Sequence, residues 1–403
     1  MHLPGGQQLG YCTNVHPYAD LPGLLSALEA QAAPLRARLV ARGLLAERAS
    51  LGVGLWLPEV VARQVAGDPA PLRARLASLG LHAFTVNAFP YGDFHGGRVK
   101  DEVFRPTWAQ DARLHYTLLA AEALAALLPG PAHGPQGLTG SVSTHTGGYK
   151  PWGAACPAPA DVARGLLAAA DGLAELELRT GRRIVLALEP EPLSLLESTA
   201  ETVAFFQRWL WPHGARARRH LGLCYDACHQ AVEFEAPRAS LAALAAAGIP
   251  IAKVQLSSAL SVPAPARHAA ALARYAEDRW FHQVVARAPD GALQRWPDLP
   301  EALDALRGGA GHGERDDWRI HFHVPLFAER LGERGELGTT RGDLAEVLAC
   351  VASGELTPHL EIETYSYALI PPDERAALGA GTLLECLERE FDWVLAELAA
   401  ARG

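Results

Sequence analysis

The residues best suited to chemistry follow a short apolar run. Residues 221–226 read LGLCYD, and Asp226 is followed three positions later by His229. If this run is a strand, its side chains alternate between two faces, so Gly222, Cys224 and Asp226 share one face. Small residues with a carboxylate at the C-terminal end suit the crowded interior of a barrel whose chemistry lies at that end. We expect Asp226 and His229 to serve one metal ion or one substrate.

Two other predicted strands carry carboxylates at the same end. By the same alternation, Glu189 and Glu363 point inward, so that with Asp226 three carboxylates converge. Converging carboxylates repel one another unless a proton or a cation holds them together. A divalent ion (Zn, Mn or Mg) is the economical explanation. The alternative is that each glutamate pairs with an arginine, such as Arg279 or Arg319.

Two alternate histidines, His321 and His323 in RIHFHVP, would share one face of a strand. Two imidazoles on one face are an efficient way to offer nitrogen ligands to one centre. The alternative is that one ring packs and the other hydrogen-bonds to a carboxylate. The predicted metal ligands are Glu189, Asp226, His323 and Glu363.

The remaining strand ends and their loops supply candidate catalytic and substrate contacts. A carboxylate can move a proton on a carbon next to a polarised oxygen, and an imidazole can orient that oxygen. Each loop residue alone is more often ordinary surface, and together they predict a polar pocket with an aromatic rim. The predicted catalytic residues are Glu189, Glu363 and His229. The predicted substrate contacts are Asn87, Tyr91, His95, His145, Lys150, Gln255 and His321.

Strand and helix patterns alternate along the whole chain. Eight strand–helix units predict one (β/α)8 TIM barrel over residues 1–403. A doubly wound open sheet is the alternative, but no glycine-rich nucleotide loop follows the first strand. The predicted strands are 9–14, 51–58, 82–88, 138–145, 183–189, 221–226, 251–257 and 359–365. The predicted barrel helices are 22–42, 59–80, 107–128, 159–180, 199–211, 238–247 and 373–401.

The spacing breaks once, between the seventh and the eighth predicted strands. We predict an insertion over 258–358 on the catalytic face, carrying a hairpin and the strand of His321 and His323. The hairpin turns at Pro289-Asp290-Gly291, a typical turn sequence. Its predicted elements are strands 280–287, 292–296 and 319–324 and helices 265–277, 299–307 and 339–352.

Composition narrows the class of function. The 403 residues carry a net charge of −9, which argues against broad binding to nucleic acids or anionic membranes and favours a small-molecule substrate. No window has the length and apolarity of a membrane span, and the N-terminus lacks a signal-peptide pattern. The six scattered cysteines are typical of reduced thiols, so we expect a cytoplasmic protein.

Three motifs, GLCYDACH, LALEPEP and LEIETY, resemble the xylose isomerase-like barrel superfamily, which includes endonuclease IV and metal-dependent sugar epimerases. The resemblance implies that Glu189, Asp226 and Glu363 are metal ligands. It implies that His229 binds metal, as in the endonucleases, or substrate, as in the epimerases, and that His145 matches a fourth-strand histidine.

The chain departs from that superfamily at two positions. Gln255 and Asn87 stand where histidines are usual on the seventh strand and, in the endonucleases, on the third. An amide binds a divalent ion more weakly than an imidazole does. The resemblance therefore implies that His323 or His282 replaces the seventh-strand ligand, or that the site is weaker or vacant.

A narrower resemblance covers nearly the whole chain. YCTNVHP, VNAFPYGDFH, GYKPW, KVQLSSAL, HFHVPLF and LEIETYSY are similar, in order and spacing, to the EboE family of metabolite traffic proteins. The resemblance implies work on a secondary-metabolite precursor beside proteins of the same operon.

Three functions follow from these observations. The first is a metal-dependent isomerase or epimerase acting on a small polyhydroxylated metabolite. The second is a non-catalytic protein that binds such a metabolite on the same barrel, since fold does not determine function. The third is an endonuclease IV-like phosphodiester hydrolase, which the net charge and the two departures argue against.

Overall fold

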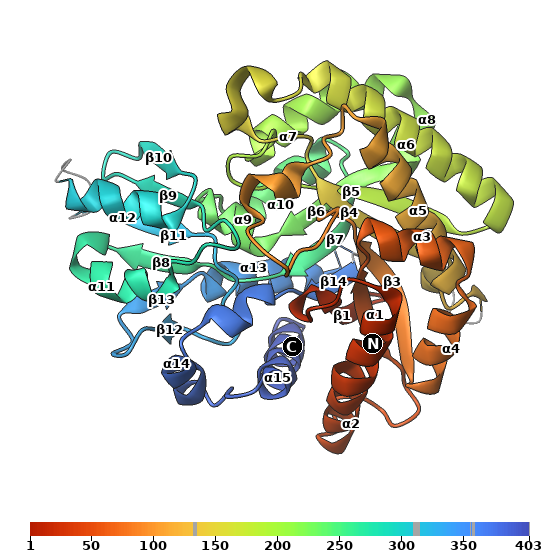
Figure 1. Ribbon diagram of the computed structural model, residues 1–403, viewed down its shortest axis with the longest axis horizontal. Coiled ribbons are helices and arrows are strands. Elements are labelled where there is room, and N and C mark those ends of the chain that lie inside the picture. Colours follow the sequence, from red (N-terminus) through yellow and green to blue (C-terminus); the bar gives the residue numbers. More distant parts are fainter. Residues whose placement is uncertain (132–134, 309–314, 355, 357–358, 403) are drawn as a thin grey trace.

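Eight parallel strands close into a barrel in the order β1-β14-β7-β6-β5-β4-β3-β2 (Figure 1). This computed structural model describes residues 1–131, 135–308, 315–354, 356 and 359–402. The predicted (β/α)8 TIM barrel is confirmed. The barrel strands are β1 (Gln8–Cys12), β2 (Leu51–Trp56), β3 (Leu81–Asn87), β4 (Thr139–His145), β5 (Arg183–Glu189), β6 (Leu221–Asp226), β7 (Ile251–Leu256) and β14 (His359–Ile362).

Helices cover the outside of the barrel. The longest, α6 (Pro159–Thr180), packs a stripe of apolar residues that includes Val162, Leu166 and Leu173 against the core, and it ends at Gly181. Gly181 has a φ of 67°, the left-handed conformation that commonly closes a helix. The other helices on the barrel are α1 (Leu21–Ala27), α2 (Ala33–Ala41), α3 (Glu59–Gly67), α4 (Ala70–Ser78), α5 (Asp111–Leu127), α7 (Thr199–Phe205), α8 (Ala215–His220), α9 (Ala227–Val232), α10 (Pro237–Ala246), α13 (Arg341–Ala352) and α15 (Leu383–Ala400).

Charged side chains fill the barrel interior below its mouth, the end at which the strands reach their carboxyl termini. Lys253 on β7 and Glu361 on β14 form a fully buried ion pair with an N–O distance of 2.6 Å. Lys253 also donates a hydrogen bond of 3.2 Å to Ser143. Gly54 on β2 leaves room for this pair, because a Cβ there would lie 1.3 Å from Glu361 Oε1.

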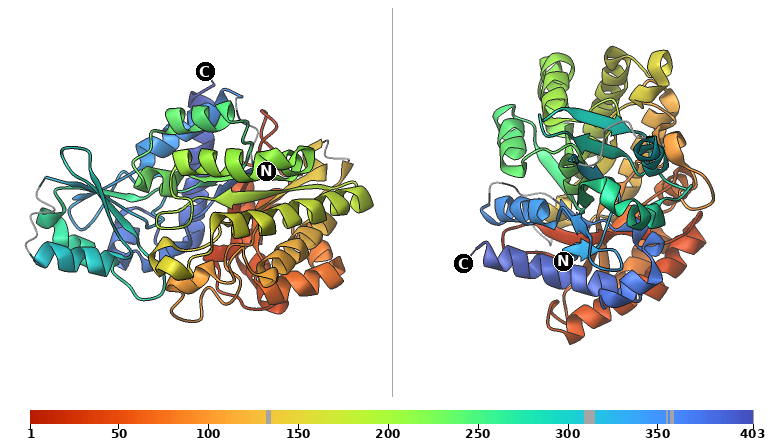
Figure 2. Two further views of the ribbon diagram at one scale, coloured as in Figure 1. Left: turned by 90° about the horizontal axis from the view of Figure 1, so that it is seen from above. Right: turned by 90° about the vertical axis from the view of Figure 1, so that its left-hand side faces the viewer.

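A second sheet extends from one side of the barrel, as Figure 2 also shows. It is antiparallel, with the order β10-β9-β11-β8-β13-β12, and it has its own hydrophobic core, which includes Trp296, Trp318 and Phe322. Its elements are β8 (Leu260–Pro263), α11 (Ala269–Leu272), β9 (Val284–Arg287), β10 (Leu293–Trp296), α12 (Leu299–Arg307), β11 (Asp317–Ile320), β12 (Arg330–Leu331) and β13 (Leu337–Thr339). The short α14 (Pro372–Ala377) follows β14.

The predicted insertion, 258–358, contains this sheet, although its residues 309–314, 355 and 357–358 lie outside the described residues. The hairpin is present, with β9 and β10 antiparallel. Helix α13 packs with α10 and α15 on the main core and so takes the place of a barrel helix. The predicted strand 319–324 ends early: β11 stops at Ile320, because the chain then leaves the sheet toward the barrel mouth. None of the described helices has the length and apolarity needed to cross a membrane.

Candidate metal centre

Three carboxylates meet at the barrel mouth. Glu189 ends β5, Asp226 ends β6, and Glu363 follows β14; each places an oxygen within 4.8 Å of the other two. All three residues are buried. Among the described residues none of them has an arginine partner, and Arg319 instead pairs with Asp343. Within the described part of the chain, Glu189 Oε2 and Asp226 Oδ2 have no hydrogen-bond partner, and a bound cation would satisfy both oxygens.

This crowding changes the proton affinity of the cluster. Burial, with the charge of Asp226 adding to it, raises the pKa of Glu189 to about 7. Burial and then the charges of Glu189 and Asp226 raise the pKa of Glu363 well above its ordinary value. Two side-chain amides at the carboxyl ends of the strands hold Glu363: Asn14 and Asn87 each donate to Oε1, at 2.8 and 3.1 Å. Without a cation, the cluster therefore retains protons near neutral pH.

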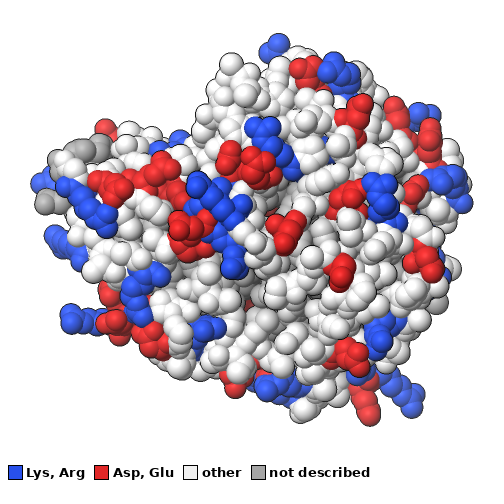
Figure 3. All heavy atoms as spheres, viewed as in Figure 1, with Lys and Arg blue, Asp and Glu red and all other residues white. Residues whose placement is uncertain are grey.

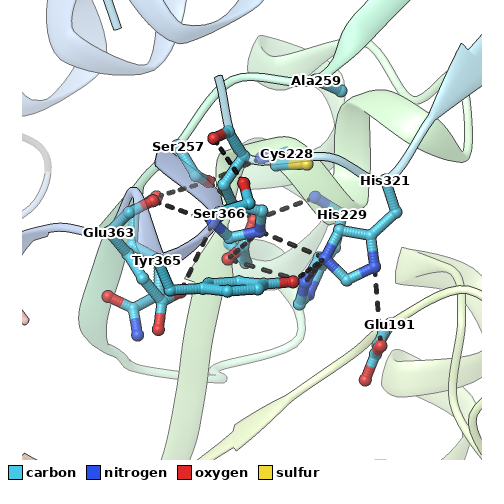
Figure 4. Close-up of polar contacts among 12 residues, drawn as sticks. Glu191, Cys228, His229, Ser257, Ala259, His321, Glu363, Tyr365 and Ser366 are labelled. Carbon is cyan, nitrogen blue, oxygen red and sulfur yellow. Dashed lines mark hydrogen bonds and ion pairs between the residues drawn. The ribbon is translucent and has the colours of Figure 1, made fainter. Parts of the chain in front are cut away.

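Three imidazoles stand beside the carboxylates (Figure 4). His229 Nδ1 lies 3.0 Å from the carbonyl oxygen of Pro190, and His323 Nδ1 lies 2.8 Å from that of Glu363. Because a carbonyl oxygen can only accept, each Nδ1 carries its hydrogen and donates it. His321 Nδ1 donates in the same way to Gln283 Oε1, at 2.6 Å. In a neutral ring the other nitrogen, Nε2, is then left with a free lone pair.

The three Nε2 atoms face one another. His321 Nε2 lies 3.2 Å from Nε2 of both His229 and His323. Asp226 Oδ2 completes the group, at 3.7 Å from His229 Nε2 and 3.9 Å from His323 Nε2. Ligands about 2.0–2.1 Å from a tetrahedral zinc ion lie about 3.3–3.4 Å apart, close to the observed nitrogen spacing. The donors therefore fit a divalent metal, and Asp226 belongs to both the imidazole group and the carboxylate group.

The proton affinities of the imidazoles differ. Burial and then the neighbouring His229 lower the pKa of His321 well below its ordinary value, and burial lowers that of His323 to about 4. Burial alone would also lower the pKa of His229, but Asp226, Glu191 and Glu189 raise it above its ordinary value. A proton shared among the three rings therefore resides on His229, and a metal ion would have to displace it.

Two residues absent from the sequence-based prediction orient His321. Gln283 donates from Nε2 to Glu191 Oε1 at 2.8 Å, which turns its Oε1 toward His321 Nδ1. Hydrogen-bonded partners of this kind fix the tautomer and orientation of a ligating histidine. Glu191 carried a signal, since it follows Glu189 by two positions in LALEPEP. Gln283 carried none, because its position depends on how the added sheet meets the barrel.

A glutamate behind the centre joins the two segments that carry His323 and Glu363. Glu390 on α15 accepts hydrogen bonds from the backbone N–H of Leu326, at 3.2 Å, and from the hydroxyl of Thr364, at 2.7 Å. Glu390 is fully buried, and burial raises its pKa to about 7.

A cavity of about 560 Å³, including its opening to solvent, lies above the centre. Its floor is polar and its walls are aromatic. The floor comprises Asn14, Asn87, Glu189, Glu191, His229, His321, His323 and Glu363, and the walls include Phe89, Phe94, Trp280, Phe281 and Tyr365.

All five predicted metal and catalytic residues therefore come together: Glu189, Asp226, His229, His323 and Glu363. The predicted substrate contacts divide into two sets. Asn87 and His321 line the cavity. Gln255 lies within the barrel, opposite both Asp226 and Glu361 in register, with both side-chain polar atoms unpartnered.

Like Gln255, the other four predicted contacts lie outside the cavity lining. Lys150 forms ion pairs with two glutamates, Glu197 at 2.5 Å and Glu201 at 2.7 Å. Tyr91 packs edge-on against a neighbouring tyrosine ring, and His145 lies edge-on to Phe89 and Phe104. His95 stands behind the aromatic wall, with Nε2 2.8 Å from the backbone oxygen of Asn14. Each of these four side chains therefore contacts neighbouring residues outside the cavity lining.

Comparison with known proteins supports the fold. No protein-family model matches the chain, and no curated protein matches it. Among solved structures, a xylose isomerase-like TIM barrel protein from Mycobacterium smegmatis in complex with magnesium is 11% identical, with 100% of both chains covered and a TM-score of 0.50. A xylose isomerase domain protein from Alicyclobacillus acidocaldarius is 14% identical, with 98% of this chain and 100% of that chain covered and a TM-score of 0.47. An L-ribulose 3-epimerase is 14% identical, with 98% and 96% covered and a TM-score of 0.46. The likeness to the first of these, at a TM-score of 0.50, agrees with the (β/α)8 barrel fold described above.

Proposed function

We propose that this protein is a divalent-metal-dependent enzyme of the isomerase or epimerase type, acting on a small polyhydroxylated metabolite. The observation that carries the proposal is the convergence of three carboxylates and three imidazole Nε2 atoms, with no lysine or arginine paired to these carboxylates among the described residues. Buried like charges persist only where a task or a cation requires them. The motifs that resemble metal-dependent sugar epimerases supply the reaction class.

The position of each residue indicates its role in the proposed reaction. Glu189, Asp226, Glu363 and His323 would hold the metal, with His229 at the same centre. A bound divalent ion supplies Lewis acidity that polarises a carbonyl or hydroxyl oxygen. Glu189 ends β5 beside this centre, where its carboxylate is placed to take a proton from a carbon and return it.

The proposal is tested by metal content and isotope exchange. We expect about one or two divalent ions per chain and metal-dependent incorporation of deuterium from D₂O into L-ribulose or D-tagatose, followed by mass spectrometry. Glu189→Gln and Glu363→Gln should each abolish exchange, whereas Glu175→Gln, on the exposed face of α6, should not. Protein that stays metal-free when supplied with Zn, Mn or Mg would contradict the proposal, as would exchange that survives both substitutions.

Binding without turnover is the second candidate. Gln255 favours it, since its amide has no partner and stands where a stronger ligand is usual. Metal-dependent ligand binding with no isotope exchange in any probe would support this function over catalysis. In either case, we propose that the protein acts in the cytoplasm on a secondary-metabolite precursor, beside proteins encoded in the same operon, as the EboE resemblance implies.

Phosphodiester hydrolysis ranks third. On the face drawn in Figure 3, Lys and Arg are interspersed with Asp and Glu, and basic residues do not form a continuous track. Binding to a nucleic-acid backbone depends on such a track. Cleavage of an abasic DNA duplex that is lost in Glu189→Ala would reverse this ranking.

A further inference from the structure

The cavity separates polar from apolar groups. All of its carboxylates, imidazoles and amides lie on the floor, while the walls are built from aromatic rings, valines, a proline and Lys100. The one wall hydroxyl, that of Tyr365, lies 3.4 Å from His321 Nε2 at the floor. A free sugar carries a hydroxyl on nearly every carbon, so its far end would place hydroxyls against these walls. Each hydroxyl buried without a partner weakens binding roughly tenfold.

The aromatic walls are held in place by contacts among themselves. Phe94 stacks on Trp280 with ring centroids 5.1 Å apart, and Tyr365 stands edge-on to both rings. Trp280 donates its indole N–H to the backbone oxygen of Phe94, at 3.0 Å. The indole therefore has no free donor, and it presents only apolar surface to a ligand. Phe281, which also lines the cavity, stacks on Tyr149 with ring centroids 5.4 Å apart.

The cavity also lacks a free cation among its described lining residues. Lys100 is its one ammonium group, and Asp298 and two backbone carbonyls already bind it: those of Glu277 at 3.1 Å and Trp280 at 2.9 Å. A phosphorylated or carboxylated tail would therefore find no positive charge at the walls. This argues against a sugar phosphate as the ligand.

We propose that the substrate is two-ended: an α-hydroxyketone or vicinal diol that faces the metal centre and carries an aromatic ring that lies between the walls. This inference rests on the proposed function and adds a substrate class to it. A planar ring gains from burial against Phe94, Trp280 and Phe281, and it needs no hydrogen bonds.

A matched pair of probes tests the proposal on the full metal-loaded chain. 2-Hydroxyacetophenone and dihydroxyacetone share the hydroxyketone group, and only the first bears an aromatic ring. We expect calorimetry to show 2-hydroxyacetophenone binding at least tenfold more tightly. Phe281→Ala, at the half-buried side of the wall, should reduce this preference severalfold and leave the metal content unchanged. Trp280→Leu provides a second variant if the first does not fold.

The outcomes separate the two proposals. Equal affinity for the two probes, or tighter binding of dihydroxyacetone, with metal bound in full, would overturn the aromatic substrate class and leave the metal enzyme standing. Failure to bind metal would overturn the proposed function, and it would be recognised from the metal content before any ligand is added. An unchanged preference in both folded wall variants would also overturn the inference.

Discussion

Asp226 has two structural roles, one for each carboxylate oxygen, and a single substitution can separate them. Its Oδ1 caps helix α9 by accepting the backbone N–H of His229 at 2.9 Å, and it also accepts the hydroxyl of Ser257 at 2.7 Å. Its Oδ2 has no partner and faces the imidazoles. Asp226→Asn keeps an oxygen for the cap and replaces the charged ligand atom, whereas Asp226→Ala removes both.

The two variants should differ in stability without metal. Loss of the cap costs about 1 kcal/mol, and loss of a hydrogen bond to a charged acceptor costs about 1.5–3 kcal/mol, so Asp226→Ala should lower the free energy of unfolding by about 2–4 kcal/mol. Asparagine caps helices about as well as aspartate. It also removes a negative charge beside Glu189 and Glu363. Asp226→Asn should therefore stay within about 1 kcal/mol of the wild type.

The response to metal should show the opposite pattern. A ligand present at 100 times its Kd stabilises the folded state by about 2.7 kcal/mol. If the lost charge weakens affinity about 100-fold, the same metal concentration equals Kd and stabilises Asp226→Asn by only about 0.4 kcal/mol.

Urea unfolding with and without a fixed free concentration of Zn²⁺ or Mn²⁺ measures both quantities. Asp298→Asn is the matched control, because Asp298 also caps a helix, α12, and lies outside the carboxylate and imidazole groups. The control should retain the full stabilisation by metal. If Asp226→Asn is stabilised as much as the wild type, Asp226 does not bind the metal and the reasoning is wrong.

Three further predictions concern protons and positioning. Metal affinity should rise about tenfold per displaced proton as the pH increases from 6 to 8, because the pKa of His229 is raised and that of Glu189 is about 7. A metal affinity that does not change between pH 6 and pH 8 would contradict this. Glu390→Gln should remove a pH dependence of the free energy of unfolding. The pKa of Glu390 is about 7 in the folded protein and about 4.5 in the unfolded chain, so protonated Glu390 contributes its full stability below pH 4.5. About 3 kcal/mol of this stability is lost as the pH rises through 7. Urea unfolding of the metal-free wild type and variant at pH 5 and pH 8 measures this. If the free energy of unfolding changes equally between the two pH values in both proteins, the prediction is wrong. Gln283→Leu should weaken metal binding about 10–100-fold in chelator competition, because it releases His321; unchanged affinity would show that this contact does not position the ring.

The barrel and its carboxylates could be predicted because both depend on local periodicity. A strand alternates its side chains strictly, so the apolar runs at 183–189 and 221–226 predicted both the strand bounds and the inward direction of Glu189 and Asp226. Parallel strands in a closed barrel bring their carboxyl ends together. The meeting of these two side chains therefore required no knowledge of tertiary contacts.

The positions of the loop residues could not be predicted, for the opposite reason. Asn87 lies at the end of β3, and Lys150 lies in the segment that follows β4. The orientation of Lys150 depends on Glu197 and Glu201, about fifty residues away in sequence. His321 was predicted on a strand, yet it lies beyond the end of β11, where the chain crosses to the barrel mouth. Contacts between distant segments have no periodic signature.

Depth along the strand decides what an inward carboxylate does. Glu361 and Glu363 share one face of the last strand segment, yet Glu361 lies two residues deeper, about 6–7 Å along the chain, and is neutralised by Lys253. Lys253 is the one lysine buried in the barrel interior among the described residues, and its charge is already paired below the mouth. Glu363 therefore remains with Glu189 and Asp226, and this local excess of negative charge, rather than the number of acidic residues, is the reason to expect a cation there.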